Sequence, residues 1–171
     1  MAEASGKVRT LDDLAALRAA WFDSGKTVVW TNGCFDLLHV GHIRSFGDAK
    51  ALGDILVVGI NSDASVRALK GDSRPIVNQT DRAEVIAALE IVDYVTIFDE
   101  STPVAALSRL RPDIHCKSAE YADGGKPMPE RETVLGYGGQ IRILPLHPGR
   151  STTDLIERIA KSVRPEAGKI R

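Results

Sequence analysis

The chain has 171 residues, 43% of them hydrophobic, which suits one compact domain with a buried core. Its 22 basic and 23 acidic side chains give a net charge of -1, so no overall field would attract nucleic acid or an anionic membrane surface. No apolar run approaches the roughly 18 residues that span a bilayer, and the first residues do not resemble a signal peptide. We therefore expect a cytoplasmic protein whose two cysteines, Cys34 and Cys116, are reduced and buried.

Strand-like and helix-like patterns alternate along the chain. Short apolar runs indicate buried strands, and apolar residues that recur every three or four positions indicate helices. In chain order we expect a helix from 11 to about 25, a strand at 27–30, a helix at 42–52, a strand at 55–60, a helix at 81–89, a strand at 94–98, a helix at 103–110, a strand at 114–116, a helix at 129–137, a strand at 141–144 and a helix from 153. This order predicts an α/β fold: a Rossmann-like, doubly wound, mainly parallel five-stranded sheet with helices on both faces. Ligands of such sheets bind at the carboxyl ends of the strands.

One stretch, about 62–80, shows neither pattern and is expected to form a long loop. Loops of that length are usually functional or disordered. For the domain organisation we expect a helical extension at 1–26, one catalytic domain at 27–162 and a flexible tail at 163–171.

The segment TNGCFDLLHVGHIRS, Thr31–Ser45, follows the first expected strand and precedes a helix. His39 and His42 lie three residues apart, so both imidazoles would share one helical face at the helix N-terminus. That terminus presents unpaired N–H groups and a partial positive charge, which favour a bound phosphate. Gly41 between them would let a phosphate approach the backbone. The alternative is that one or both histidines only cap the helix or pack in the core.

These residues carry a resemblance. TNGCFDLLHVGH resembles the signature of the HxGH nucleotidyltransferase superfamily, which includes cytidylyltransferases and phosphopantetheine adenylyltransferase. RSTTDLI, beginning at Arg150, resembles the segment that opens the last helix in the cytidylyltransferase branch. Together with GINSDASVRALKGDSRP and the Asp81-Arg82 pair, these segments are most similar to the D-glycero-β-D-manno-heptose 1-phosphate adenylyltransferase family. The resemblance implies that ATP and a sugar 1-phosphate give a nucleotide sugar, here ADP-heptose, and pyrophosphate. It also implies a homo-oligomer, a dimer or tetramer.

The chemistry of such a reaction fits the residue types. An ionised phosphate monoester is already a nucleophile and needs no general base. The enzyme must align two anions and neutralise the charge on the departing pyrophosphate. We therefore expect His39 and His42 to donate to the triphosphate. The remaining nucleotide contacts are expected from the first turn and from three later positions or segments: Thr31, Gly33, Cys34, Phe35, Gly41, Arg82, Gly149, Arg150, Ser151 and Thr152.

The resemblance assigns the cations different partners. Lys70, on the long loop, maps to the lysine that holds the acceptor phosphate, and Arg82 maps to an arginine that contacts nucleotide phosphate. Lys117, a third cation expected to act in catalysis, follows the fourth strand, where heptose enzymes carry a Lys-Gly-Gly-Asp type segment. Here Ser118 and Ala119 replace the two glycines and remove their conformational freedom.

Polar residues after the first two strands are the other candidates. Asn61, Ser62 and Asp63 would read sugar hydroxyls, or would instead form a turn and a helix cap. Asp36 would hold Mg²⁺ or orient a neighbouring cation. His115 and His147 are expected to be structural.

Two other functions remain open. The first is a CTP-dependent cytidylyltransferase that acts on glycerol 3-phosphate or a similar small phosphate. The second is a nucleotide-binding regulatory domain without turnover, which would not need a second set of cations for an acceptor phosphate. In each case the partners are small molecules, with neither nucleic acid nor membrane.

Overall fold

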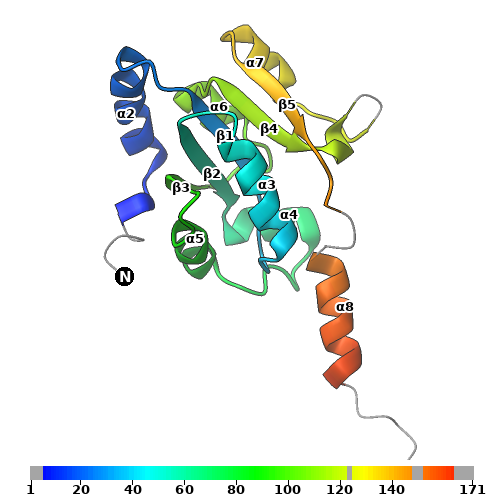
Figure 1. The fold of residues 1–171 in the computed structure, drawn as a ribbon. Coiled ribbons are helices and arrows are strands. Elements are labelled where there is room, and N and C mark those ends of the chain that lie inside the picture. The colour runs from blue at the N-terminus through cyan, green and yellow to red at the C-terminus, as the bar shows by residue number, and fades with distance from the viewer. Residues whose placement is uncertain (1–5, 123–124, 148–151, 164–171) are drawn as a thin grey trace, which may run out of the picture.

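The computed structural model describes residues 6–122, 125–147 and 152–163. Figure 1 shows a central sheet surrounded by helices, with the last helix extending away from the sheet. In chain order the elements are α2 (Leu11–Asp23), β1 (Val28–Gly33), α3 (Val40–Lys50), β2 (Ile55–Asn61), α4 (Asp63–Lys70), α5 (Gln79–Ala87), β3 (Tyr94–Phe98), α6 (Val104–Leu110), β4 (Ile114–Ser118), the 3-10 helix η1 (Ala119–Tyr121), α7 (Arg131–Gly136), β5 (Gln140–Leu144) and α8 (Thr152–Val163).

The five strands form one sheet in the order β3-β2-β1-β4-β5, and every pair in it is parallel. The predicted Rossmann-like five-stranded sheet is therefore confirmed. The strand order reverses direction at β1, which pairs with β2 on one side and with β4 on the other. Folds of this type bind their ligands at such a switch point, beyond the carboxyl ends of the strands.

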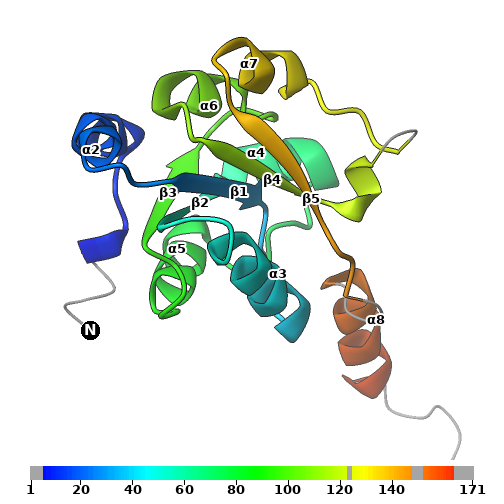
Figure 2. The same ribbon diagram turned by 45° about the horizontal axis from the view of Figure 1, so that its top comes forward.

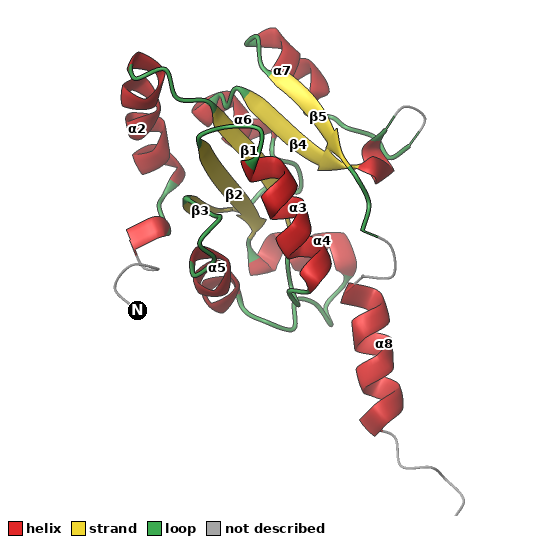
Figure 3. Cartoon of the chain, in the orientation of Figure 1, coloured by secondary structure: helices red, strands yellow, loops and turns green. Residues whose placement is uncertain are grey.

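Helices cover both faces of the sheet, as Figures 2 and 3 show. On one face, α3 and α5 pack their buried residues against β1, β2 and β3, with Phe46 and Ile86 fully covered. On the other face, α2, α6 and α7 pack around Trp30 of β1. Because both faces are covered, the strands are apolar along most of their length, which explains the continuous apolar runs in the sequence.

Helix α2 packs against α6 and is part of this core. Its capping box forms as the sequence predicts: the Thr10 side chain accepts from the Asp13 N–H, and the Asp13 side chain accepts from the Thr10 N–H. Leu14 is completely buried, and the Arg18 guanidinium pairs with Asp113 at 2.7 Å. The segment expected as an N-terminal extension is thus tied to the sheet by apolar and ionic contacts.

The prediction of a long loop at 62–80 is wrong in its first half, because this stretch begins with a helix, α4. The Ser62 side chain caps this helix by accepting from the Ser65 N–H, and Gly71 follows its last residue with φ of 90°. Only the remaining part, up to α5, is irregular. The helix was missed because it is short, with only eight residues.

Helix α8 has no buried residue, and Figure 1 shows it pointing away from the sheet. Among the residues that the structure describes, no helix is long and apolar enough to cross a membrane.

Candidate active site

A cavity of about 570 Å³ opens at the carboxyl ends of β1, β2 and β4. Its walls come from the turn after β1, the first turns of α3, the end of α4 and the segment that follows β4. Several predicted site residues line it together: Thr31, Gly33, Cys34, Phe35, His42, Asn61, Lys70 and Lys117. Residues from distant parts of the sequence therefore meet where the fold predicts a ligand site.

The turn after β1 is fixed by Phe35. This residue has φ of 44°, a left-handed conformation that is uncommon outside glycine. Its ring packs edge-on against His42, with centroids 5.2 Å apart, and against Phe46 at 5.0 Å. A Cβ at Gly33 would lie 3.1 Å from the Phe35 ring, so the glycine lets the ring close over the strand end. The backbone turn and the first turns of α3 are thereby held together.

The paired histidines lie at the start of α3, as predicted. His39 is the N-cap residue, Gly41 is buried in the first turn, and the two imidazoles stack with centroids 3.8 Å apart. Burial, together with electrostatic repulsion from His39 and Lys70, lowers the pKa of His42 to about 4. At neutral pH the His42 ring is therefore uncharged and can donate through only one of its nitrogens. In this state His42 can serve as a hydrogen-bond donor but not as a cation.

A buried charged group forms the opposite wall of the cavity. The Lys117 ammonium lies 2.7 Å from a Glu130 carboxylate oxygen and 4.5 Å from the centre of the Tyr121 ring. The same Glu130 oxygen lies 3.2 Å from His115 Nε2. Burial opposes ionisation of Glu130, but the hydrogen bonds from His115 and Lys117 outweigh it and lower its pKa to about 2. Burial also lowers the pKa of His115. Lys117 is thus held in one place by a permanently ionised partner.

Lys70 and Asn61 complete the cavity on the side of α4. Lys70 is the last residue of that helix, and Asn61 ends β2. The Asn61 amide donates to Ser65 Oγ at 3.0 Å and to the Glu100 carbonyl at 3.3 Å, which fixes its orientation. Cys34 was expected to be buried, but it is only partly buried and lines the cavity. Its partial burial raises the pKa of the thiol. Cys116 is fully buried, as predicted.

Of the two roles expected of Asp36, the structure shows the second, because its carboxylate pairs with a neighbouring cation, Arg74. Its carboxylate is buried and accepts from the N–H groups of Ile76 and Val77 and from the Arg74 guanidinium. Burial alone would raise the pKa of Asp36, but these donors lower it below its usual value. The described residues contain no group of three or more His, Cys, Asp or Glu side chains that could hold a metal ion. Asp36 thereby anchors the loop before α5 to the turn after β1.

Arg82 is also a structural residue rather than a nucleotide contact. Only 1% of its side chain is exposed. The guanidinium donates to the carbonyls of Cys34 at 2.6 Å and Val77 at 3.0 Å, and to the Asp63 carboxylate at 2.8 Å. All its donor nitrogens are therefore directed at protein oxygens. It supports the phosphate turn from behind by holding the Cys34 carbonyl.

Ser62 and Asp63 do not face the cavity as sugar contacts but belong to the turn and helix cap that were the alternative for them. Ser62 caps α4, and Asp63 pairs with Arg82, so neither lines the cavity. Ser118 precedes η1 and Ala119 is its first residue. Among the described residues other than glycine, only Phe35 and Arg111 have a positive φ, so the backbone at 118 and 119 does not require glycine. The loss of the two glycines therefore causes no strain at these positions.

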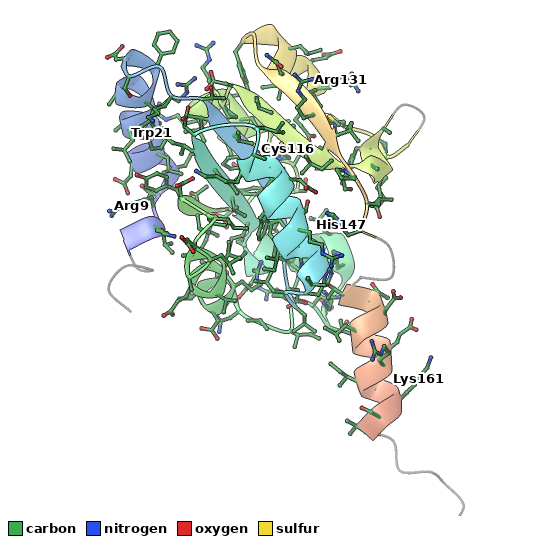
Figure 4. All side chains as sticks on the ribbon, in the orientation of Figure 1. Arg9, Trp21, Cys116, Arg131, His147 and Lys161 are labelled. Atoms are coloured by element: carbon green, nitrogen blue, oxygen red, sulfur yellow. The ribbon has the colours of Figure 1, made fainter. Side chains whose placement is uncertain are left out.

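The second predicted motif lies partly outside the described residues, which exclude Gly149, Arg150 and Ser151. Thr152 is the first residue of α8, and its hydroxyl donates to the Leu37 carbonyl at 3.4 Å, next to the phosphate turn. His147 lies beside α3 in Figure 4, where its ring nitrogen is 2.9 Å from the Asp48 carboxylate. His147 and Thr152, on either side of the residues that are not described, therefore both lie close to α3 or the turn before it.

Residues 30–158 match the family described as cytidylyltransferase-like, which is well over half of the chain. This chain belongs to the cytidylyltransferase-like family. As a member of this family it is a nucleotidyltransferase.

Curated relatives of this cytidylyltransferase-like chain carry one name. Bifunctional protein HldE of Koribacter versatilis is 50% identical over 155 residues, which cover 91% of this chain and 32% of that protein. Bifunctional protein HldE of Geobacter sulfurreducens is 48% identical over 160 residues, which cover 94% of this chain and 32% of that protein. The chain thus spans about a third of the length of these relatives.

Solved structures support the same fold. The lipopolysaccharide core biosynthesis protein from Thermoplasma volcanium aligns with a TM-score of 0.58 and 27% identity, covering 72% of this chain and 98% of that chain. A pantoate-beta-alanine ligase from Francisella tularensis aligns with a TM-score of 0.57 and 13% identity, covering 91% of this chain and 76% of that chain. The second likeness concerns the fold alone.

Glu130 is the main residue that sequence reasoning missed. It stands at the start of a short helix, where a glutamate is ordinarily exposed. A partial signal was present in β4, since His115 and Lys117 are two residues apart on a strand and so share one face. A histidine and a lysine on a buried strand require an acidic partner. Other lining residues that the sequence did not indicate are Ser45, Ser101, Thr102, Glu120, Tyr121 and Lys126.

The Glu130 group predicts a pH dependence of stability. The pKa values of Glu130 and His115 are lowered by folding, so the unfolded chain binds more protons in acid and the free energy of unfolding falls as the pH falls. The His115 contribution is lost first, below about pH 6.5, and the Glu130 contribution between about pH 4.5 and 2. For Glu130 the loss is roughly 3 kcal/mol, and Glu130→Gln should remove this slope while lowering stability at pH 7.

Urea unfolding at several pH values between 2 and 7 measures this. Glu120→Gln is the matched control, because Glu120 pairs with Lys126 at the exposed rim, where about half of each side chain is in solvent. It should leave the pH dependence unchanged. A Glu130→Gln variant that keeps the wild-type slope would show that Glu130 is not the buried ionised group.

Proposed function

We propose that this chain transfers AMP from ATP to a sugar 1-phosphate of the heptose class, giving ADP-heptose and pyrophosphate. The observation that carries the proposal is one cavity with His42 at a helix N-terminus on one wall and the ammonium groups of Lys70 and Lys117 on the others. Relatives named bifunctional protein HldE at 41–50% identity support it, as does the likeness to a lipopolysaccharide core biosynthesis protein.

The reaction is a direct displacement at phosphorus. An oxygen of the acceptor phosphate forms a bond to the α-phosphorus of ATP, while the bond from that phosphorus to the bridging oxygen of the pyrophosphate breaks. The acceptor phosphate is ionised at neutral pH, so no protein base is needed. This agrees with the state of Glu130, the buried carboxylate of the cavity, because its charge is committed to Lys117 and His115.

The side chains would share the work of binding and charge neutralisation. His42 would donate from an uncharged ring to the phosphates of ATP, beside the N–H groups that begin α3. Lys117 and Lys70 would hold the two reacting phosphates close together from the opposite walls. A single charge at a helix terminus is worth about 0.3–1 kcal/mol at an exposed site, so catalysis requires these donors to act together.

The described residues do not fit a resident magnesium ion, because the oxygens of Asp36 are taken up by backbone donors and Arg74. We therefore assign no step to a protein-bound metal. The sugar would contact the side of the cavity at Asn61, whose carbonyl oxygen lies 3.9 Å from Cys34 Sγ. A three-carbon acceptor would leave such polar groups unpaired.

The proposal predicts a substrate preference. ATP with D-glycero-β-D-manno-heptose 1-phosphate should give a kcat/KM at least about tenfold higher than CTP with glycerol 3-phosphate, or about 1.4 kcal/mol of discrimination in the transition state. Pyrophosphate release, measured for each nucleotide with each acceptor at several concentrations, provides the comparison. Preference for CTP with glycerol 3-phosphate would replace this proposal by the cytidylyltransferase alternative. Nucleotide binding without turnover on any acceptor would favour a regulatory domain.

A further inference from the structure

A second cavity, of about 610 Å³, lies at the opposite edge of the sheet, where β4 and β5 begin. It is formed by α2, the end of α6 and the turn before β5. We propose that this cavity binds a small organic phosphate with a planar ring. The inference does not depend on the identity of the transferred nucleotide or of its acceptor.

The positive side of the cavity consists of Arg18, Arg109 and Arg111. Asp23 and Asp113 are the acidic residues among its lining residues. Asp113 is already used: one of its oxygens accepts from Arg18 at 2.7 Å and the other from the Val28 N–H at 2.7 Å. Arg109 pairs with Asp12 at 3.1 Å, so Arg111 is the cavity arginine that has no ion pair among the residues that the structure describes. Guanidinium groups suit phosphate because they present several N–H donors in a fixed plane.

Two polar atoms in the walls lack partners. Arg18 is fixed in orientation, because Nε donates to the Arg111 carbonyl at 3.1 Å and Nη2 donates to Asp113. Its Nη1 and the Tyr137 hydroxyl are both buried and have no hydrogen-bond partner among the residues that the structure describes. A buried donor left unsatisfied costs about 1–3 kcal/mol, so a small side-chain movement that lets an acceptor reach these atoms recovers this energy. Burial, together with the charge of Asp113, raises the pKa of Tyr137 to about 12, so its hydroxyl keeps a proton to donate.

The backbone at Arg111 also points to a ligand. Arg111 has φ of 50°, a left-handed conformation that costs about 1–2 kcal/mol in a residue other than glycine. A glycine would end α6 without this cost. The arginine instead gives its carbonyl to Arg18 and places its guanidinium over the Tyr137 ring, 5.9 Å from the ring centre. Strain of this kind is characteristic of binding sites.

The aromatic residues indicate the rest of the ligand. Phe22 is 71% exposed, although it is a large apolar side chain, and it lies at this cavity with the Arg18 guanidinium 5.8 Å from its ring centre. Tyr137 provides a second ring, and Ala15, Ala19, Leu110 and Pro112 provide apolar walls. An exposed ring beside fixed arginines suits a planar group that carries a phosphate.

Titration of the whole chain with phenyl phosphate, followed by amide NMR spectra, tests the site directly. We expect saturable shifts at the amides of Gly138, Gly139 and Gln140, separate from any shifts at the histidine pair of the other cavity. Benzoate and inorganic phosphate should bind there more weakly, because each lacks one half of the proposed ligand. Shifts confined to the first cavity, or equal binding of benzoate, would overturn the proposal.

Two variants examine the donors with little effect on the fold. Tyr137→Phe removes only the hydroxyl and should weaken phenyl phosphate binding at this site roughly threefold to tenfold. Arg111→Asn removes the charge in a residue type that tolerates the left-handed conformation, and should weaken binding roughly tenfold. Arg158→Gln, which removes a charge from the exposed helix α8, is the control and should bind as the wild type. Unchanged binding in both cavity variants, with normal thermal unfolding, would contradict the assignment.

Discussion

Replacing His42 by alanine should lower kcat by a factor of about 10²–10³, the scale observed when one donor to the transition state is removed. His42 lines the cavity at the start of α3 and is held between the Phe35 ring and His39. Because its pKa is about 4, its contribution should not change between about pH 6 and 8. Steady-state pyrophosphate release over this pH range measures both the loss and the absence of a histidine titration.

The control for this variant is His147→Ala. His147 is the partner of Asp48 on α3 and lies outside the cavity, so its loss should change kcat only slightly. Thermal unfolding of both variants separates a loss of structure from a loss of a donor. If His42→Ala keeps its activity within threefold of the wild type and unfolds normally, His42 is structural.

Replacing Lys117 by methionine should reduce kcat/KM by about 10²–10³ and also destabilise the fold by about 3–5 kcal/mol. The two effects have separate causes. The lost ammonium no longer neutralises phosphate charge in the cavity, and Glu130 is left buried with His115 as its remaining side-chain partner. Activity assays and urea unfolding of the same preparations give the two values.

The double variant Lys117→Met with Glu130→Gln distinguishes the two causes. It removes both charges of the buried pair, so it should recover much of the lost stability but none of the lost activity. Lys50→Met is the matched control, since Lys50 pairs with Asp93 where about a third of each side chain is exposed. Its cost should be about 1 kcal/mol or less, with normal activity. Recovery of activity in the double variant would show that the Lys117 charge is not catalytic.

The architecture could be predicted because its signals are local. The buried runs at 55–60 and 94–98 became strands, and the apolar spacing after the glycine-containing turn became α3. The two histidines could be placed at a helix N-terminus because a strand precedes them and helical spacing follows. Helix α4 was missed because it has only eight residues, and its clearest signals are the cap at Ser62 and the glycine at Gly71.

The roles of charged residues could not be predicted to the same extent. Arg82 and Asp36 have the chemistry of phosphate and metal ligands, but their partners are the Cys34 carbonyl and the N–H groups of Ile76 and Val77. Such pairings join residues about 40 or more positions apart, and they depend on how the loop before α5 folds back onto the turn. The partners of Glu130 are closer in sequence, with His115 15 positions away, but they lie on another element, β4, so this pairing also depends on tertiary contacts. The sequence indicates which groups can bind a ligand, while tertiary contacts decide which of them remain available.

The most direct test of AMP transfer follows the phosphorus atoms of ATP. The chain is incubated with D-glycero-β-D-manno-heptose 1-phosphate and with ATP labelled at either the α- or the γ-phosphorus, and the products are separated. The proposed reaction places the α label in ADP-heptose and the γ label in pyrophosphate. Transfer of the γ label to the sugar, or an α label that stays entirely in free nucleotides while pyrophosphate is absent, would contradict it.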